Sequence, residues 1–502
     1  MTTGWWAAPE QARRPRRLRR LVLVVGLAGL FAASATAGWA YADPVAFGTA
    51  LDGVVRLAPL DVMPAGAAAP DPGAGAGAVL APAATPDAGA AATQPASEAS
   101  TAAPTASPSA PTASPRPLTS TTAVPAPDVS AATAARLDRA LARAQKALLL
   151  PGVEATVIFA DGSTWNGAAG LADVAAARPV EPATPFAAAS VTKTFTSALI
   201  LRYVDQGLIK LDDPLARWLP AWPNARKITV RMLLNHTSGI RDFFRNPKLD
   251  LALNKDMTRT WTSAEVMESY IPKGAAFPPG TSWSYSNTNY LLLGVVAAQV
   301  GGAPWEELVR RELIDPLGLD STYVQGFELP PAVPALAYRI IDGFYGPTPQ
   351  ARTDGSTVVP FRSVVTAAGS AGAIASTAGD LARWARALYG GTGVVSAATR
   401  REMLTFVKAY LYGTVTSYGL GVSRVGFDGH SAYGHTGALV GTRAAIRYFP
   451  REKVTVAVLF NRETFVGDDV VRILARNIFP KPVASPSPSP GASPSPTPTA
   501  AP

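Results

Sequence analysis

The sequence predicts an α/β protein with one antiparallel sheet whose strands come from both ends of the folded region. Two apolar segments near its start, 153–160 and 163–169, are separated by a turn, and so are two segments near its end, 443–449 and 454–460. The long middle carries apolar residues mostly at helical spacing. We therefore expect helices to flank the sheet and an inserted, mostly helical lobe to fill the middle of the chain.

Composition limits this fold to residues 129–480 of the 502. Residues 64–128 are rich in Ala, Pro, Ser, Thr and Gly, and residues 481–502 repeat Ser-Pro and Thr-Pro. Neither stretch has enough large apolar side chains to offset the entropy of ordering. We interpret residues 43–128 as a disordered linker and 481–502 as a disordered tail, and whether 43–63 packs on the folded region stays open.

The first predicted elements are a helix and a hairpin. Apolar residues recur at helical spacing before Pro151: Leu137, Leu141, Ala144 and Leu148. The dipeptide at 161–162, Asp-Gly, predicts a tight turn between the first two strands.

A second helix is predicted to start around residue 190 and to end before Gly207. Further helices are expected at 290–300, 378–388 and 468–478. Two Thr-x-x-acid patterns are typical of helix starts: Thr262 with Glu265, and Thr377 with Asp380.

The N-terminus predicts export. Six arginines between residues 13 and 20 precede 22 uncharged residues at 21–42, long enough as a helix to span a bilayer of about 30 Å. An A-x-A pattern at 40–42 also fits cleavage by a signal peptidase. Two interpretations of residues 1–42 stay open, a transmembrane anchor and a signal peptide. Either one makes the protein extracytoplasmic, anchored by residues 21–42 or secreted.

Charge and cysteine content exclude several classes of function. The chain has no cysteine, so disulfides and a thiol nucleophile are excluded. Of the formal charge of +9, the first 42 residues contribute six arginines and one glutamate, which leaves only +4 for the rest and no basic stripe for nucleic acid. The three histidines do not have metal-ligand spacing. We expect no metal, no cofactor and no nucleic acid partner.

Ser190 and Lys193 stand at the start of the second helix and, three positions apart, share one helical face. A lysine here can accept the proton of the serine, whereas an arginine stays protonated. Only ten of the 45 basic residues are lysines, which favours a chemical role for this one. Taken alone, the pair leaves two interpretations open, a nucleophile with its base and an ordinary surface pair.

Two more motifs follow. A Tyr-x-Asn motif at 285–287 precedes the helix at 290–300 and by itself indicates a loop that caps that helix. A His-Thr-Gly motif at 435–437 precedes an apolar run, at a position that could begin an edge strand. A lone histidine there is ordinarily a structural loop residue.

In this order, the three motifs resemble those of the serine β-lactamase and penicillin-binding family, in the branch of D-alanyl-D-alanine carboxypeptidases, class C β-lactamases and related esterases. Other stretches similar to this branch are 234–240, 279–280, 316–319 and 376–381. The resemblance covers nearly all of residues 137–478. It implies a β-lactamase/transpeptidase-like fold.

The resemblance also implies a role for each motif residue. Ser190 would attack a carbonyl and form an acyl-enzyme, Lys193 would lower the pKa of the neighbouring phenol, and Tyr285 would act as base toward Ser190 and later toward water. The backbone N–H groups of Ser190 and Ala438 would form the oxyanion hole. The expected substrate-binding residues are Asn287, which would bond the substrate amide, and His435, Thr436 and Gly437, the first two on the leaving-group side.

One departure from the family bears on the substrate. Class C β-lactamases usually have Lys-Thr-Gly, whose cation faces the substrate carboxylate, whereas His435 is at most partly charged at neutral pH. Ala438 also lacks a hydroxyl that would help to hold a carboxylate. Both differences argue against an efficient β-lactamase and weaken the carboxypeptidase interpretation. Arg443 is a candidate source of the missing charge.

We therefore predict an exported serine hydrolase that works through an acyl-serine intermediate. The first candidate is a D-alanyl-D-alanine carboxypeptidase acting on peptidoglycan peptides. The alternatives are an esterase or weak class C-like β-lactamase acting on a small ester or amide, and a catalytically silent wall-binding module. The presence of serine, lysine and tyrosine argues against the silent module. If the N-terminal segment is uncleaved, the membrane is a further partner. An α/β-hydrolase is disfavoured because no Gly-x-Ser-x-Gly occurs.

Overall fold

A computed structural model describes the chain from residue 127 to 479, except for residues 344–345, 392, 412–413 and 464–466. The segments 1–42 and 481–502, and nearly all of 43–128, lie outside the described residues and stay predictions. Within the described part, no helix is both long and apolar enough to cross a membrane.

The predicted sheet is confirmed, and it joins the two ends of the folded region. Strand β1 (Gly152–Ile158) pairs antiparallel with β2 (Thr164–Asp173) on one side and with β14 (Val454–Phe460) on the other. Strand β13 (Thr442–Phe449) follows next to β14. Every residue of β1, β13 and β14 is buried, because helices cover both faces of the sheet here.

The sheet is larger than the sequence predicts, with nine strands in the order β3-β2-β1-β14-β13-β12-β11-β10-β9. The additional strands are β3 (Arg178–Pro179), β9 (Val407–Leu411), β10 (Thr414–Tyr418), β11 (Ser423–Phe427) and β12 (His430–Leu439). Most of them are short, and β9 and β11 are partly exposed, so their apolar pattern is weak. The hairpin turn at 161–162 is also longer than predicted. The hydrogen bond from Phe159 N–H to the Ser163 carbonyl closes the hairpin before residue 160, so this residue belongs to the turn as well.

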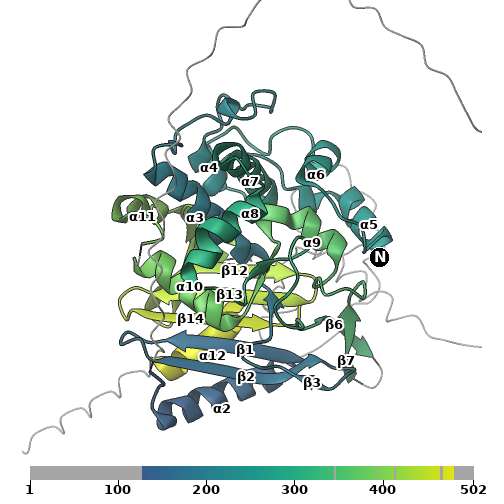
Figure 1. Cartoon of the computed structure of the whole chain (residues 1–502), viewed down its shortest axis with the longest axis vertical. Helices are drawn as coiled ribbons and strands as arrows, with labels where there is room; N and C mark the ends of the chain where they lie inside the picture. Colours follow the sequence, from purple (N-terminus) through teal and green to yellow (C-terminus); the bar gives the residue numbers. More distant parts are fainter. Residues whose placement is uncertain (1–126, 344–345, 392, 412–413, 464–466, 480–502) are drawn as a thin grey trace, which may run out of the picture. The chain divides into compact units, whose positions relative to one another are not determined.

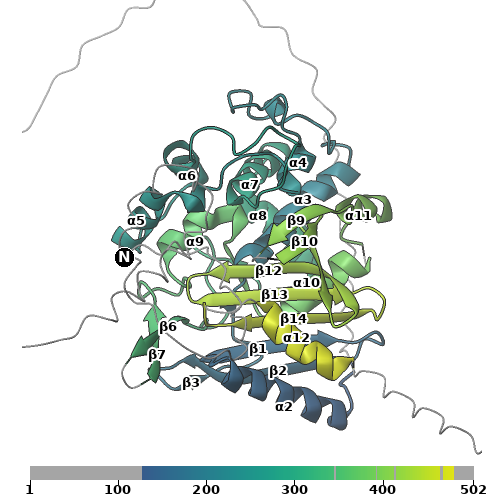
Figure 2. The same ribbon diagram turned by 180° about the vertical axis from the view of Figure 1, so that it is seen from behind.

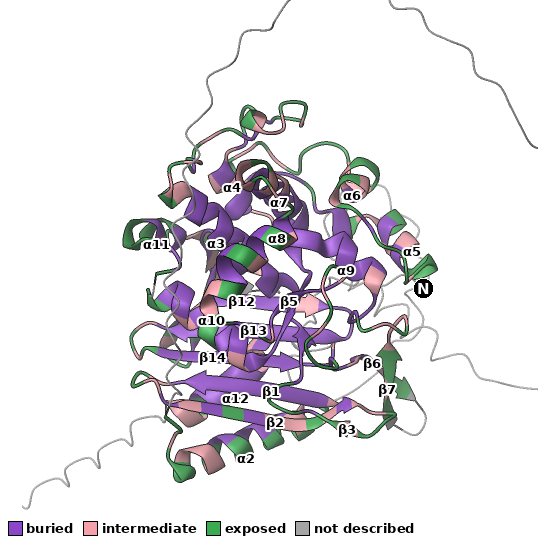
Figure 3. Ribbon diagram, in the orientation of Figure 1, coloured by how far each residue is buried: buried purple, intermediate pink, exposed green. Residues whose placement is uncertain are grey.

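Helices α2 (Ala131–Ala147) and α12 (Gly467–Ile478) cover one face of the sheet (Figure 2). Helix α10 (Ala378–Gly390) and the helical lobe cover the other face (Figure 1). Two apolar cores result, one on each side, and the larger one fills the space between sheet and lobe. In Figure 3 strands β12–β14 and helix α3 are coloured mostly as buried, whereas helices α5, α6 and α11 carry exposed residues.

The lobe is mostly helical, as predicted, and its helix α3 contacts strand β12 directly. Its helices are α3 (Thr192–Asp205), α4 (Val230–Leu234), α5 (Pro247–Lys255), α6 (Ser263–Tyr270), α7 (Asn287–Gly301), α8 (Trp305–Val309) and α9 (Arg362–Ala368); α11 (Ala397–Met403) packs beside α3. Small strands that the sequence analysis did not predict complete it: β4 (Phe186–Ala187), β5 (Tyr323–Val324) and β8 (Ile374–Ser376), and the ribbon of β6 (Ala337–Gly343) and β7 (Gly346–Arg352).

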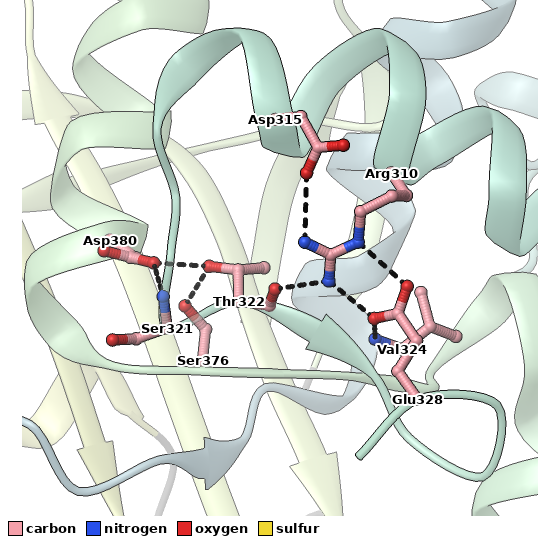
Figure 4. A network of polar contacts seen from close by, with 8 residues as sticks. All are labelled: Arg310, Asp315, Ser321, Thr322, Val324, Glu328, Ser376 and Asp380. Carbon is pink, nitrogen blue, oxygen red and sulfur yellow. Dashed lines mark hydrogen bonds and ion pairs between the residues drawn. The ribbon is translucent and has the colours of Figure 1, made fainter. Parts of the chain in front are cut away.

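The two predicted helix starts differ in their side-chain bonds. Thr262 and Glu265 cap α6 reciprocally, as predicted. Thr377 accepts from Asp380 N–H at the start of α10, but the Asp380 carboxylate accepts from the Ser321 N–H and Thr322 hydroxyl, each at 2.9 Å (Figure 4). The second capping box, at Thr377 and Asp380, is therefore only half formed. The Asp380 carboxylate instead links α10 to the segment before β5.

Candidate active site

Ser190 lies in a single 3₁₀ turn, η1 (Ala189–Val191), between strand β4 and helix α3. Ala189 just before it has φ of +50°, a left-handed conformation that costs a residue with a Cβ about 1 kcal/mol. The Ala188 N–H bonds to the Ile374 carbonyl of β8 at 2.9 Å, which holds the turn against the lobe. Ser190 is thus 6% exposed and stands at the N-terminal end of α3, where the helix dipole favours negative charge.

Lys193 is fully buried in the first turn of α3. Its Nζ lies 3.0 Å from Ser190 Oγ, 2.7 Å from Asn287 Oδ1 and 2.7 Å from the Ala371 carbonyl oxygen. Burial lowers the pKa of Lys193 to about 7, although Asp242 acts in the opposite direction. The amine is therefore half deprotonated near neutral pH and is able to accept the serine proton.

Asn287 begins helix α7 and connects Lys193 to a buried carboxylate. Its Oδ1 accepts from Lys193, while its Nδ2 donates to both oxygens of Asp242 at 3.2 and 2.9 Å. The motif predicted that Asn287 would bond the substrate amide, but in this structure both ends of its side chain are engaged by the protein. Asp242 belongs to none of the predicted site residues, and the available signal was its position just after the 234–240 stretch.

Tyr285 lies beside Lys193, with Nζ 5.0 Å from the ring centroid. The loop that carries Tyr285 is held by His236, whose ring centroid is 4.4 Å from that of Tyr285. His236 Nδ1 accepts from Ser286 N–H at 3.2 Å, and the His236 carbonyl accepts from Ser284 N–H at 3.1 Å. The 234–240 stretch, noted in the sequence for its resemblance alone, therefore positions the Tyr-x-Asn motif.

The His-Thr-Gly motif lies on β12, which is an interior strand of the sheet. Its pairing with β11 ends at Gly434, so residues 435–439 pair with β13 alone and have an open side toward η1. The edge expected from the sequence thus exists locally.

Gly437 lies on β12 directly against the start of the turn that carries Ser190. A Cβ at this position would lie 2.1 Å from the Ala188 carbonyl oxygen. This glycine lets the strand approach the turn that carries Ser190, and Ala438 follows directly. The arrangement is compatible with an oxyanion hole formed by backbone N–H groups of Ser190 and Ala438.

His435 is buried and hydrogen-bonded at both ring nitrogens. Its Nδ1 contacts the Thr436 carbonyl oxygen at 2.5 Å and therefore carries the proton, so Nε2 accepts from the Tyr418 hydroxyl at 2.8 Å. Burial lowers the pKa of His435 to about 3. The imidazole is neutral at physiological pH, and Tyr418, which the sequence analysis missed, stabilises that state.

The two remaining predicted residues, Thr436 and Arg443, lie on β12 and β13. Thr436 is buried on β12 opposite Ala445. Arg443 donates from Nη1 to the Leu439 and Thr442 carbonyls, both at 2.8 Å, in its own hairpin. Across the described ranges, no group of three or more His, Cys, Asp or Glu side chains lies close enough to hold a metal ion.

Comparison with known proteins finds relatives of similar sequence and fold. Penicillin-binding protein 4 of Amycolatopsis lactamdurans is 30% identical over 327 residues, 62% of this chain and 81% of that protein. A D-stereospecific amidohydrolase from Streptomyces sp. has a TM-score of 0.59 and 29% identity over 68% of this chain and 98% of its own. The D-amino acid amidase of Ochrobactrum anthropi SV3, in complex with L-phenylalanine amide, has a TM-score of 0.58 and 25% identity over 69% and 97%.

The solved structures confirm the β-lactamase/transpeptidase-like fold expected from the sequence. A family model described as Beta-lactamase matches residues 137–478 and so spans the segments that carry Ser190, Lys193, Tyr285 and His435. The chain belongs to the Beta-lactamase family of serine hydrolases.

Proposed function

We propose that this protein hydrolyses small amides or esters through an acyl-Ser190 intermediate, with D-amino-acid amides as the first substrate class. The contact between Lys193 Nζ and Ser190 Oγ at 3.0 Å carries the proposal. A neutral amine has two N–H groups and one lone pair. The Asn287 and Ala371 oxygens only accept, so they take both N–H groups and leave the lone pair for the Ser190 hydroxyl.

The proposed reaction has two halves. As Ser190 Oγ bonds to the substrate carbonyl carbon, its proton passes to Lys193, and the oxyanion is held by backbone N–H groups. The tetrahedral intermediate then expels the amine or alcohol, which takes up that proton, relayed from Lys193 through Tyr285. Water next attacks the acyl-serine and gives up a proton through Tyr285 to Lys193, and as the acid is released this proton returns to Ser190 Oγ. In this scheme Lys193 accepts the first proton, and Tyr285 beside it serves the leaving group and the water, rather than acting first as the sequence analysis expected.

The substrate class is inferred from charge. A neutral His435, bonded to Tyr418, does not present the cation that would pair with a substrate carboxylate. Arg443 keeps its positive charge, and its Nη1 is held by carbonyls of the β12–β13 turn. The neutral His435 therefore supports substrates without a free carboxylate at this end. The names of two relatives, a D-stereospecific amidohydrolase and a D-amino acid amidase, support the D-amino-acid class.

The D-alanyl-D-alanine carboxypeptidase predicted from the sequence is the second candidate. The likeness to penicillin-binding protein 4 favours it, and peptidoglycan peptides would then be the substrate. The neutral His435 argues against it, because the terminal carboxylate would lack a counter-charge from the His-Thr-Gly motif. The weak class C-like β-lactamase meets the same objection. The esterase alternative shares the chemistry of the first candidate, and a silent module would form no acyl-enzyme.

The candidates are separated by offering three substrates to the purified protein. D-phenylalanine amide, a short-chain nitrophenyl ester and a D-Ala-D-Ala peptide are followed by release of ammonia, nitrophenol and D-alanine. We expect the first two to be hydrolysed and Ser190→Ala to be inactive. Release of D-alanine without amide turnover would select the carboxypeptidase. A chain with no turnover, and with no covalent adduct to a fluorescent penicillin by intact mass, would be the silent module.

We further propose that the enzyme works outside the cytoplasm. The support is the arginine-rich segment followed by the uncharged run at 21–42. Expression of the full chain, followed by fractionation and N-terminal mass analysis, tests this. Recovery in the membrane fraction with an intact N-terminus indicates an anchor, and a processed soluble form indicates a signal peptide. Recovery in the cytoplasm contradicts both.

A further inference from the structure

Asp242 is a buried carboxylate one amide group away from the lysine of the site. It is 6% exposed and caps the 3₁₀ turn η3 (Phe243–Arg245) by accepting from Phe244 N–H at 3.1 Å. Its two oxygens also accept from Asn287 Nδ2, and Asn287 Oδ1 faces Lys193. A carboxylate that only caps a 3₁₀ turn can do so at the protein surface. The burial of Asp242 beside the catalytic residues therefore indicates a second role.

The Asn287 amide could in principle face Lys193 with either end. In the flipped orientation, its NH₂ group would compete for the amine lone pair, and its oxygen would face the Asp242 carboxylate. A carboxylate accepts hydrogen bonds and cannot donate, so it selects the observed orientation. The Asn287 carbonyl then takes one N–H of Lys193.

We propose that Asp242 is a positioning residue for acylation. It orients Asn287 so that the lone pair of Lys193 faces Ser190. Its negative charge also stabilises the Lys193 ammonium once the serine proton has moved. The proposal rests on the proposed function, because it assumes that Lys193 is the first proton acceptor. It adds a residue outside the three family motifs.

The charges around Lys193 make this assignment testable. Lys193 faces the rings of Tyr285 and Tyr290, with Nζ 5.0 and 5.4 Å from their centroids, and it interacts electrostatically with His236 and His435. Burial holds the pKa of both histidines well below the usual value of 6.5, so both are neutral. Burial also raises the pKa of Asp242, and the Phe244 N–H, Lys193, Arg245 and Asn287 act against that rise.

The test replaces Asp242 by asparagine, which keeps the shape and a cap for Phe244 N–H but removes the charge and the obligatory acceptor. The two hydrogen bonds and the width of the amide separate the carboxylate and Nζ by at most about 8 Å, so loss of the charge should lower the pKa of Lys193 by about one to two units. The maximal rate should fall by about tenfold to a hundredfold, because misorientation of a catalytic group by about 1 Å has that effect.

Two measurements are made on the full chain. The first is the pKa of Lys193 by NMR of ¹³C-labelled lysine, with its signal assigned by its loss in Lys193→Arg. The second is the pH profile of nitrophenyl ester hydrolysis, whose acid limb should move to lower pH in Asp242→Asn. Asp242→Ser, which keeps a hydroxyl as cap, should shift both in the same direction. Asp161→Asn is the matched control, because Asp161 caps Ser163 N–H in the same way at an exposed turn and should change neither.

An unchanged or raised pKa of Lys193 in Asp242→Asn overturns the proposal. So does a lower rate with an unmoved acid limb, which is the signature of a merely structural role. If the wild-type protein does not turn over the ester, the proposed function fails, while the NMR titration still decides whether Asp242 acts on Lys193. If Asp242→Asn does not fold, Asp242→Ser carries both measurements.

Discussion

Replacement of Gly437 by alanine should separate the nucleophile from the strand that is proposed to complete the oxyanion hole. The added Cβ would lie 2.1 Å from the Ala188 oxygen, 3.0 Å from its carbonyl carbon and 3.2 Å from Ala189 Cβ. Ordinary carbon–oxygen contacts are more than 3 Å, so β12 and η1 must move apart by about 1 Å. Loss of one oxyanion donor costs about 100- to 1000-fold in rate, and a misplacement of about 1 Å costs about 100-fold.

We therefore expect kcat/KM of Gly437→Ala to fall by at least about 100-fold and the protein to lose about 1–3 kcal/mol of stability through overpacking. Nitrophenyl ester hydrolysis and thermal melting measure the two effects. Gly426→Ala on β11 is the control, since a Cβ there meets nothing within 4 Å, and its rate should match the wild type. Wild-type rate and melting temperature in Gly437→Ala would refute the assigned contact.

Four further predictions follow from the charges in the site. Lys193→Arg should lose nearly all hydrolysis of the nitrophenyl ester, and retained turnover would mean that the lysine acts only as a cation. Wild-type kcat/KM should rise with pH through about 7, as Lys193 loses its proton, and a profile flat between pH 6 and 8 would contradict this. Tyr418→Phe removes the donor to His435 Nε2, so NMR titration should show a raised pKa of His435, and no rise would exclude the assigned bond. The folded protein binds a proton on His435 less readily than the unfolded chain, so the free energy of unfolding should fall as the pH drops below 6.5. This fall should be steeper in the wild type than in His435→Gln, by about 1.4 kcal/mol per pH unit. Equal slopes in urea titrations would count against a neutral His435.

The central sheet was predictable because β1, β13 and β14 are buried on both faces and therefore appear as apolar runs. Strands β9–β11 were not, because they are only five residues long and alternate weakly. The small strands within the lobe are set by contacts with distant segments, such as the pairing of Phe186 with Ser376, and no local pattern records such a pairing.

The motifs allowed the residues around Ser190 to be named but not their mutual contacts. The chain brings Lys193 and Asn287 together across 94 positions, as the motif order suggested. Asp242 and Tyr418 belong to none of the three motifs. Asp242 acts through two hydrogen bonds from Asn287, and Tyr418 acts through one to His435. Their roles depend on the orientation of the Asn287 amide and of the His435 imidazole. The spacing of residues along the sequence does not indicate side-chain orientation.

The movement of charge during acylation explains how the charged groups of the site are arranged. Before reaction the amine is about half deprotonated near neutral pH, because burial opposes the ammonium, and Asp242 attracts only the protonated fraction. When Ser190 attacks, Lys193 becomes positive while the substrate oxygen becomes negative. The Asp242 carboxylate then stabilises the new ammonium through the oriented Asn287 amide, and this attraction is stronger in the transition state than in the ground state. A lysine paired directly with a carboxylate would be protonated from the start and would be a poor base. Separation of the two charges by one amide is therefore what allows Lys193 to be deprotonated near pH 7 and yet to accept a proton.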